Sequence, residues 1–198
     1  MHDDSAVKAA KREVRPAYSC CHPNAKGTGC TVCFEMHPAH DFVEGSVFVT
    51  FAPQRTVGSC EGGVRRLPSF DWENRITVRL SINEVAELLE VFRGYREKMG
   101  DGKGLFHRTA KADTVITLEH RLEPSPGYLF GVSRKPAEGE QRRMGILISM
   151  KEAIVLSEAL AGSLVFMAFG VPKVVSRPAV SVPLSGIAGD GAEMKEVA

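Results

Sequence analysis

The sequence lacks several features that would place it in a specialised class of protein. It has no uninterrupted apolar run of the roughly 18 residues that a membrane span needs; the longest, within residues 159–171, contains Gly162 and Ser163. Its start, Met1-His2-Asp3-Asp4, resembles neither a signal peptide nor a transit peptide. We therefore expect no membrane partner and a cytoplasmic protein of a prokaryote or phage, with no support for an organelle.

Cysteine and net charge are also low. The five cysteines are an odd number in a chain with 43% apolar residues, which favours a reducing compartment over a disulfide framework. The formal net charge of +1 gives no evidence for a nucleic-acid partner by itself. The charge is unevenly distributed, since residues 7–26 carry five cations and one acid.

One strand-to-helix junction occurs twice in the chain. Residues 76–80 and 144–148 are rich in alternating apolar residues, and the segments that follow have the 3.6-residue apolar spacing of a helix. Between them stand Ser81-x-x-Glu84 and Ser149-x-x-Glu152, the pattern of a capping box. The two serines are 68 residues apart, which indicates a duplicated unit of several strands closed by one helix.

The pattern predicts an α+β fold with two antiparallel four-stranded sheets, each followed by a helix. The expected strands are residues 29–36, 45–51, 64–70, 75–80, 105–110, 114–122, 128–133 and 143–148, and the expected helices are 82–99 and 150–169. Gly170 and Pro172 supply the last stop signal. The domain organisation follows as a loosely ordered basic arm (1–25), one domain (26–172) and an extended or disordered tail (173–198).

The expected strand 75–80 shows how the sheets are covered. Ile76, Val78 and Leu80 alternate with arginine and threonine, so one face packs on the helices and the other stays available to solvent or a ligand. A duplicated sheet of this kind suits a long ligand better than a small substrate.

Five short motifs then follow one another in a specific order: Lys26-Gly27-Thr28-Gly29-Cys30, residues 45–53 ending in Phe51-Ala52-Pro53, Phe70-Asp71-Trp72-Glu73-Asn74, Leu80-Ser81-Ile82-Asn83-Glu84-Val85, and Phe106-His107. In this order they resemble the Whirly family of single-stranded DNA-binding proteins, whose fold is of the Whirly/PC4 type. One departure is Thr28, which stands where the family has a second lysine, and it bears on the higher-order assembly attributed to that motif.

The resemblance implies non-sequence-specific binding of single-stranded DNA between sheets of neighbouring protomers, with RNA as an alternative ligand. It further implies a homotetramer formed through the helices. The corresponding function lies in DNA replication, recombination, repair or transcription, without catalysis and without a cofactor.

A site for single strands needs cations for phosphates and flat groups for bases. The candidate cationic and backbone residues are Lys26, Gly27, Thr28, Arg75, Arg79, Lys111, Arg134, Lys135, Arg142 and Arg143. The candidate stacking platforms are Phe34, Trp72, Phe106, His107 and Tyr128. Packing in the core is the competing role for Phe34 and Trp72, and Tyr128 can simply end a hairpin.

The main rival is a zinc-assisted or protein-interaction module without nucleic-acid binding. Its candidate ligands are Cys20, Cys21, His22, Cys30, Cys33, His37 and His40. Cys30-x-x-Cys33 has metal-like spacing, but in a strand these two side chains point to opposite faces and cannot share one ion. We therefore assign no metal site and expect most cysteines to be small buried hydrophobes.

Residues 100–104, Gly-Asp-Gly-Lys-Gly, look like a phosphate loop. They follow a helix, however, so no helix N-terminus points at a ligand there. His107, His120 and Glu119 form no recognisable acid–base or nucleophile set. The sequence predicts no enzyme.

Overall fold

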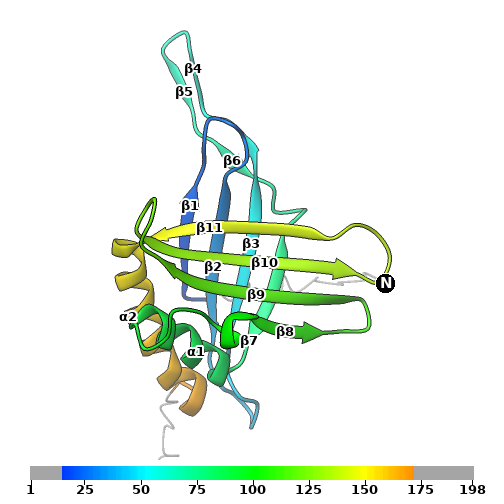
Figure 1. Ribbon diagram of the computed structural model, residues 1–198, viewed down its shortest axis with the longest axis vertical. Coiled ribbons are helices and arrows are strands. Elements are labelled where there is room, and N and C mark those ends of the chain that lie inside the picture. Colours follow the sequence, from blue (N-terminus) through cyan, green and yellow to red (C-terminus); the bar gives the residue numbers. More distant parts are fainter. Residues whose placement is uncertain (1–14, 172–198) are drawn as a thin grey trace, which may run out of the picture.

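Two antiparallel sheets cross face to face, and two helices lie together at one end of them (Figure 1). The computed structural model describes residues 15–171. The elements are β1 (Ala17–His22), β2 (Cys30–His37), β3 (Ser46–Thr56), β4 (Ser59–Glu61), β5 (Val64–Arg66), β6 (Ser69–Phe70), β7 (Ile76–Leu80), α1 (Ile82–Phe92), a 3-10 turn (Gly100–Gly102), β8 (Leu105–Arg108), β9 (Ala112–Arg121), β10 (Gly127–Pro136), β11 (Arg142–Ser149) and α2 (Met150–Phe169).

The predicted α+β class with antiparallel sheets and two helices is confirmed, with a difference in the first sheet. That sheet has five strands in the order β1-β2-β3-β6, and β7 also pairs with β3. The second sheet has the expected four, in the order β11-β10-β9-β8. Strands β4 and β5 form a separate two-stranded hairpin.

Three aromatic side chains hold the sheets together. Phe130 of the second sheet stacks on Phe34 at a centroid distance of 5.6 Å and contacts Phe51 at 5.0 Å. All three rings are buried. Such pairs add about 0.5–1.5 kcal/mol each beyond the area that they bury, so this cluster fixes how the sheets cross.

Both helices begin at the predicted capping boxes. The Ser81 backbone N–H donates to Glu84 Oε2 at 2.8 Å, and the Ser149 N–H donates to Glu152 Oε2 at 2.9 Å. In return, each serine hydroxyl accepts from the glutamate N–H. These reciprocal bonds satisfy backbone groups that would otherwise be unpaired at the helix start.

Each capping glutamate also bonds a histidine from the other repeat. His22 of β1 lies 2.8 Å from Glu152, which caps the helix after the second sheet. His107 of β8 bonds Glu84, which caps the helix after the first sheet. The first strand of each repeat is thereby tied to the helix of the other.

Three predicted boundaries were wrong, each for a local reason. Residues 17–22 were expected in the arm but form β1, which pairs along its length with β2 and buries Cys20. Helix α1 ends at Phe92, not near Met99, because Gly94 takes a left-handed conformation at φ 76°. The strand expected over 64–70 is split between β5 and β6 by Pro68, which cannot donate to a strand ladder.

Residues 1–14 of the expected arm and the whole expected tail, residues 173–198, lie outside the described residues. The domain limits placed there stay predictions.

Helix α2 corrects the expectation that no segment has the size and apolarity of a membrane span. Met150–Phe169 meets both criteria by length and composition, with a mean hydropathy of 1.7, and 28% of the relevant window is buried inside the chain. The helix packs against α1 and both sheets. Its exposed residues are mostly apolar and include Ile154, Val165 and Phe169, and two are charged, Lys151 and Glu158.

We predict that the two capping glutamates make the stability of the fold decrease more steeply as the pH falls. Burial acts to raise the pKa of each carboxyl, but hydrogen bonds from the cap serine and the histidine outweigh it and hold the pKa of Glu84 and of Glu152 below the ordinary 4.5. A lowered folded-state pKa gives stability that is complete above the unfolded value and is lost as the pH falls through the folded one.

The measurement compares urea midpoints from about pH 6 to about pH 3. E84Q/E152Q keeps an oxygen that accepts the cap bonds but does not titrate, so it should lose less stability than wild type over this range. The control is E138Q/E140Q, at two exposed carboxylates with no hydrogen bond among the described residues. Equal acid dependence in wild type and E84Q/E152Q would contradict the prediction.

Candidate nucleic-acid interface

The first candidate residues lie on the tight loop between β1 and β2. Asn24 organises this loop, because its Oδ1 accepts the backbone N–H groups of Lys26 at 3.0 Å and Thr28 at 3.1 Å. Gly27 has φ 71°, which favours glycine. Lys26 and Thr28 are exposed, so the loop holds a cation at the end of the first sheet.

A second group lies on the turn between β6 and β7. Asp71 Oδ1 accepts from the N–H groups of Glu73 and Asn74, and these bonds, with one from the Asn74 side chain, lower the pKa of Asp71. The turn leaves the Trp72 side chain 44% exposed. Arg75 donates to the Trp72 carbonyl at 2.7 Å. The turn therefore presents an indole ring beside a guanidinium group.

The second sheet brings two further arginines to this turn. Arg142 donates to the Asn74 carbonyl at 3.4 Å. Arg134 donates to the Thr77 carbonyl of β7 at 3.1 Å and to the Thr114 hydroxyl at 3.1 Å. Where the sheets cross, the structure thus gathers Trp72, Arg75, Arg134 and Arg142, which are scattered in the sequence.

The free end of the second sheet holds other predicted residues. Phe106 is 55% exposed, and the guanidinium of Arg108 lies 5.3 Å from its ring centroid. Lys111 is exposed in the turn before β9, and Lys135 pairs across the strands with Asp113. This end offers one further platform among several cations.

Two predicted platforms are core residues. Phe34 and Tyr128 are each 4% exposed. The Phe34 ring stacks on Phe130, and the Tyr128 hydroxyl donates to the Phe92 carbonyl at 3.0 Å. Burial also raises the pKa of Tyr128. Since neither ring has a free face, we remove both from the proposed interface.

His107 and Arg79 lie apart from the crossing. His107 is bonded to the Glu84 cap, as described above. Arg79 is exposed on β7 and donates to the Glu44 carbonyl at 3.4 Å. Arg143 is exposed on β11 and bonds Gln141.

Sequence reasoning missed four arginines near these groups: Arg55, Arg65, Arg66 and Arg108. All four are exposed. A signal was present for two of them, because Arg65-Arg66 follows the hairpin-forming Gly62-Gly63 pair with only Val64 between them. The expectation of one strand over 64–70 hid that hairpin.

The cysteines include both buried and exposed side chains. Cys20 and Cys30 are buried, and burial raises their thiol pKa to about 12 and about 11. The other three are not buried, so the expectation that most cysteines are small buried hydrophobes was wrong. Cys21 and Cys60 are exposed. Within residues 15–171, no three His, Cys, Asp or Glu side chains come together in a group that could hold a metal ion.

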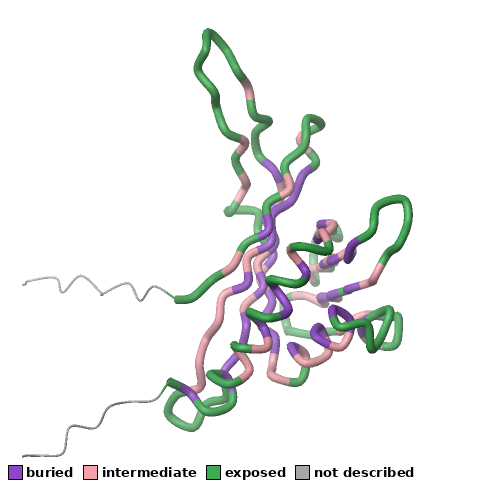
Figure 2. The backbone as a smooth tube through the Cα atoms, turned by 90° about the vertical axis from the view of Figure 1, so that its left-hand side faces the viewer, coloured by how far each residue is buried: buried purple, intermediate pink, exposed green. Residues whose placement is uncertain are grey.

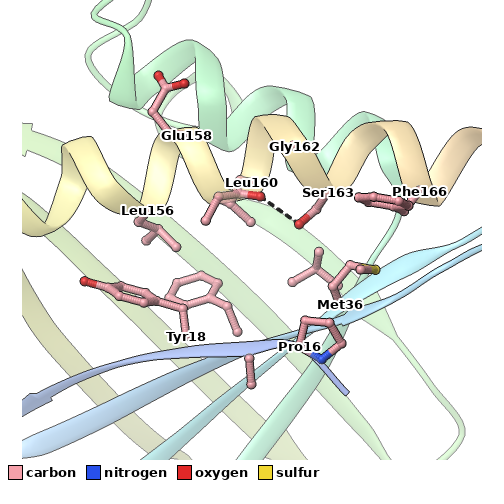
Figure 3. A pocket seen from close by; sticks show the side chains of 13 residues that line it. Pro16, Tyr18, Met36, Leu156, Glu158, Leu160, Gly162, Ser163 and Phe166 are labelled. Carbon is pink, nitrogen blue, oxygen red and sulfur yellow. Dashed lines mark hydrogen bonds between the residues drawn. The ribbon is translucent and has the colours of Figure 1, made fainter. Parts of the chain in front are cut away.

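A pocket of about 360 Å³ lies elsewhere, between α2 and the β1–β2 face of the first sheet (Figure 3). Tyr18, Met36 and Phe166 are among its apolar walls. Glu158 is the one charged lining residue. This lining supplies no set of catalytic groups.

Comparison with solved structures identifies the fold. The chain is similar to WHY1 from Arabidopsis thaliana, with a TM-score of 0.60 and 20% identity over 79% of this chain and 87% of that one. It is similar to WHY3 from the same plant, with a TM-score of 0.59 and 21% identity over 78% and 89% of the two chains. No protein-family model and no curated protein sequence matches. The fold is Whirly-like, as the sequence motifs predicted.

The different environments of two candidate rings lead to a prediction about stability. F34A removes a ring from the contact between the sheets and should lower the free energy of unfolding by about 3–5 kcal/mol. W72A removes an exposed ring and should change it by no more than about 0.5 kcal/mol. Urea denaturation of both variants checks this. A large loss in W72A would show that the indole packs as a structural residue.

Proposed function

We propose that this protein binds single-stranded DNA without sequence preference. The observation that carries the proposal is the exposed Trp72 beside Arg75 and Arg142 on a Whirly-like fold. Whirly proteins bind single-stranded DNA, and the chain offers the groups that such binding requires.

The physical basis is a combination of stacking and charge. Stacking on an aromatic ring contributes about 1–3 kcal/mol per base and tolerates any base. Trp72 and Phe106 supply two exposed rings. The surrounding cations neutralise phosphates, and each neutralised phosphate steepens the log–log salt dependence of binding by about 0.7. This chemistry recognises single strands and does not distinguish one base from another.

The cellular role follows as part of the same proposal. The protein would protect or present single strands during DNA replication, recombination, repair or transcription. It would act without catalysis in the cytoplasm of a prokaryote or in a phage-infected cell.

We further propose that the protein is a homotetramer assembled through its helices. Helix α2 exposes a set of apolar side chains that would otherwise stay in water: Met150, Ile154, Val155, Val165, Phe166 and Phe169. Burying apolar surface contributes about 25 cal/mol per Å². Assembly would cover this face and would account for its membrane-like composition without a membrane.

The binding proposal predicts a clear preference for single strands. A labelled oligo-dT should bind, duplex DNA of equal length should bind much more weakly, and the single-strand affinity should fall with salt. W72A should weaken binding about tenfold or more, from the loss of one stacking contact. Fluorescence anisotropy measures each affinity. Equal affinity for single strand and duplex would contradict the proposal.

The assembly proposal predicts that charge on α2 separates the chains. Wild type should have the mass of about four chains in light scattering, the assembly that helix packing would give. I154E/V165E should yield smaller species because two carboxylates would be buried. V64E/L67E, which adds the same two charges at exposed apolar side chains of the β4–β5 hairpin, away from α2, is the matched control. A wild-type monomer, or recovery of wild type with membranes, would contradict the proposal.

A further inference from the structure

A slender hairpin projects from the first sheet far beyond the body of the molecule (Figures 1 and 2). We call residues 57–68, which contain β4 and β5, the hairpin arm. None of these residues is buried. A lone two-stranded hairpin is marginally stable in water. Because the arm adds no side chain to the core, a role in stabilising the fold does not explain it.

The arm and its root are basic. Arg55, Arg65 and Arg66 stand against one acid, Glu61, over residues 55–68. In the described part of the chain, the guanidinium groups of Arg65 and Arg66 have no hydrogen bond or ion pair; only the backbone of these residues is paired, in the β4–β5 ladder. Arg65 lies opposite Cys60 and Arg66 opposite Ser59, so consecutive arginines point to opposite faces of the ribbon. Both faces of the arm thus present a guanidinium group.

The root of the arm adjoins the candidate interface. A Cβ at Gly27 would lie 3.6 Å from Val57, so the loop that carries Lys26 contacts the start of the arm. On the other side, the Asp71 N–H donates to the Pro53 carbonyl at 2.8 Å, which places the Trp72 turn beside β3. The arm therefore extends from the place where Lys26 and Trp72 are held.

We propose that the hairpin arm binds the phosphates of a single strand that runs on from the sheet surface. This inference rests on the proposed function and adds a contact surface to it. Guanidinium groups pair with phosphate through two parallel hydrogen bonds, and weak hydration makes arginine suited to the task. From Val57 to Glu61 the arm reaches about 13 Å at roughly 3.3 Å per residue, enough to follow a strand past the edge of the sheet.

Single-stranded nucleic acid is favoured over a second protein by the charges. The arm carries two arginines against one acid, Glu61, and its aliphatic side chains are scattered over the ribbon. A protein interface would instead be depleted in charge at its centre. A contact with a second copy remains an outcome that the experiment detects.

The test compares the salt dependence of binding in wild type and R65A/R66A. The probe is a labelled oligo-dT of about 30 nucleotides, longer than the roughly 4–16 nucleotides covered by one single-strand-binding OB fold. Loss of two phosphate contacts should lower the magnitude of the log–log slope by about 1.4, which corresponds to about twentyfold weaker binding at about 0.1 M salt. R93A/K103A removes two exposed cations of the α1–β8 connection and should leave the slope unchanged.

The outcomes separate the two proposals. Absence of single-strand binding by wild type overturns the proposed function. If wild type shows salt-dependent binding and R65A/R66A has the same slope, only the proposal for the hairpin arm is overturned. A change in the mass of R65A/R66A by light scattering also overturns it, because the arm would then contact another chain. All 12 residues of the arm are outside the core, so the variant should retain the wild-type melting temperature.

Discussion

The contact between the two sheets decides what the rest of the surface can do. Phe130 packs on Phe34 and Phe51, and this cluster sets the crossing of the sheets. The crossing then brings the end of β10 and the start of β11 against β7 and the turn before it, where Arg134 and Arg142 reach backbone carbonyls. Without that packing, the arginines of one sheet and the indole of the other would have no fixed position relative to one another.

Features with local causes could be predicted from the sequence. The capping boxes depend on residues three positions apart, so Ser81 and Glu84 are sufficient to locate the start of α1. The four strands of the second sheet follow from alternation and turn residues in the same way. Strand β1 was missed because its inward residues include Cys20 and His22, which suggested metal ligands more strongly than a packed face.

Features with distant causes could not be predicted. Whether a ring packs or is exposed depends on partners that only the fold supplies. Phe34 meets Phe130 of the other repeat, and Tyr128 reaches the end of α1, whereas Trp72 is left partly in water. In the sequence, core packing competed with base stacking for Phe34 and Trp72, and the end of a hairpin competed with it for Tyr128. The proximity of Arg75, Arg134 and Arg142 could not be predicted either, although each of the three was a candidate residue.

The exchange of histidines between the repeats has a consequence for how the molecule holds together. Each repeat completes its helix cap with a side chain from the other repeat. This arrangement is expected of two copies that associate as a pair. The segment from Arg93 to Gly104 joins them covalently. A short connection of this kind raises the effective concentration of one unit around the other to the millimolar range. The two repeats therefore behave as an internal dimer that does not dissociate on dilution.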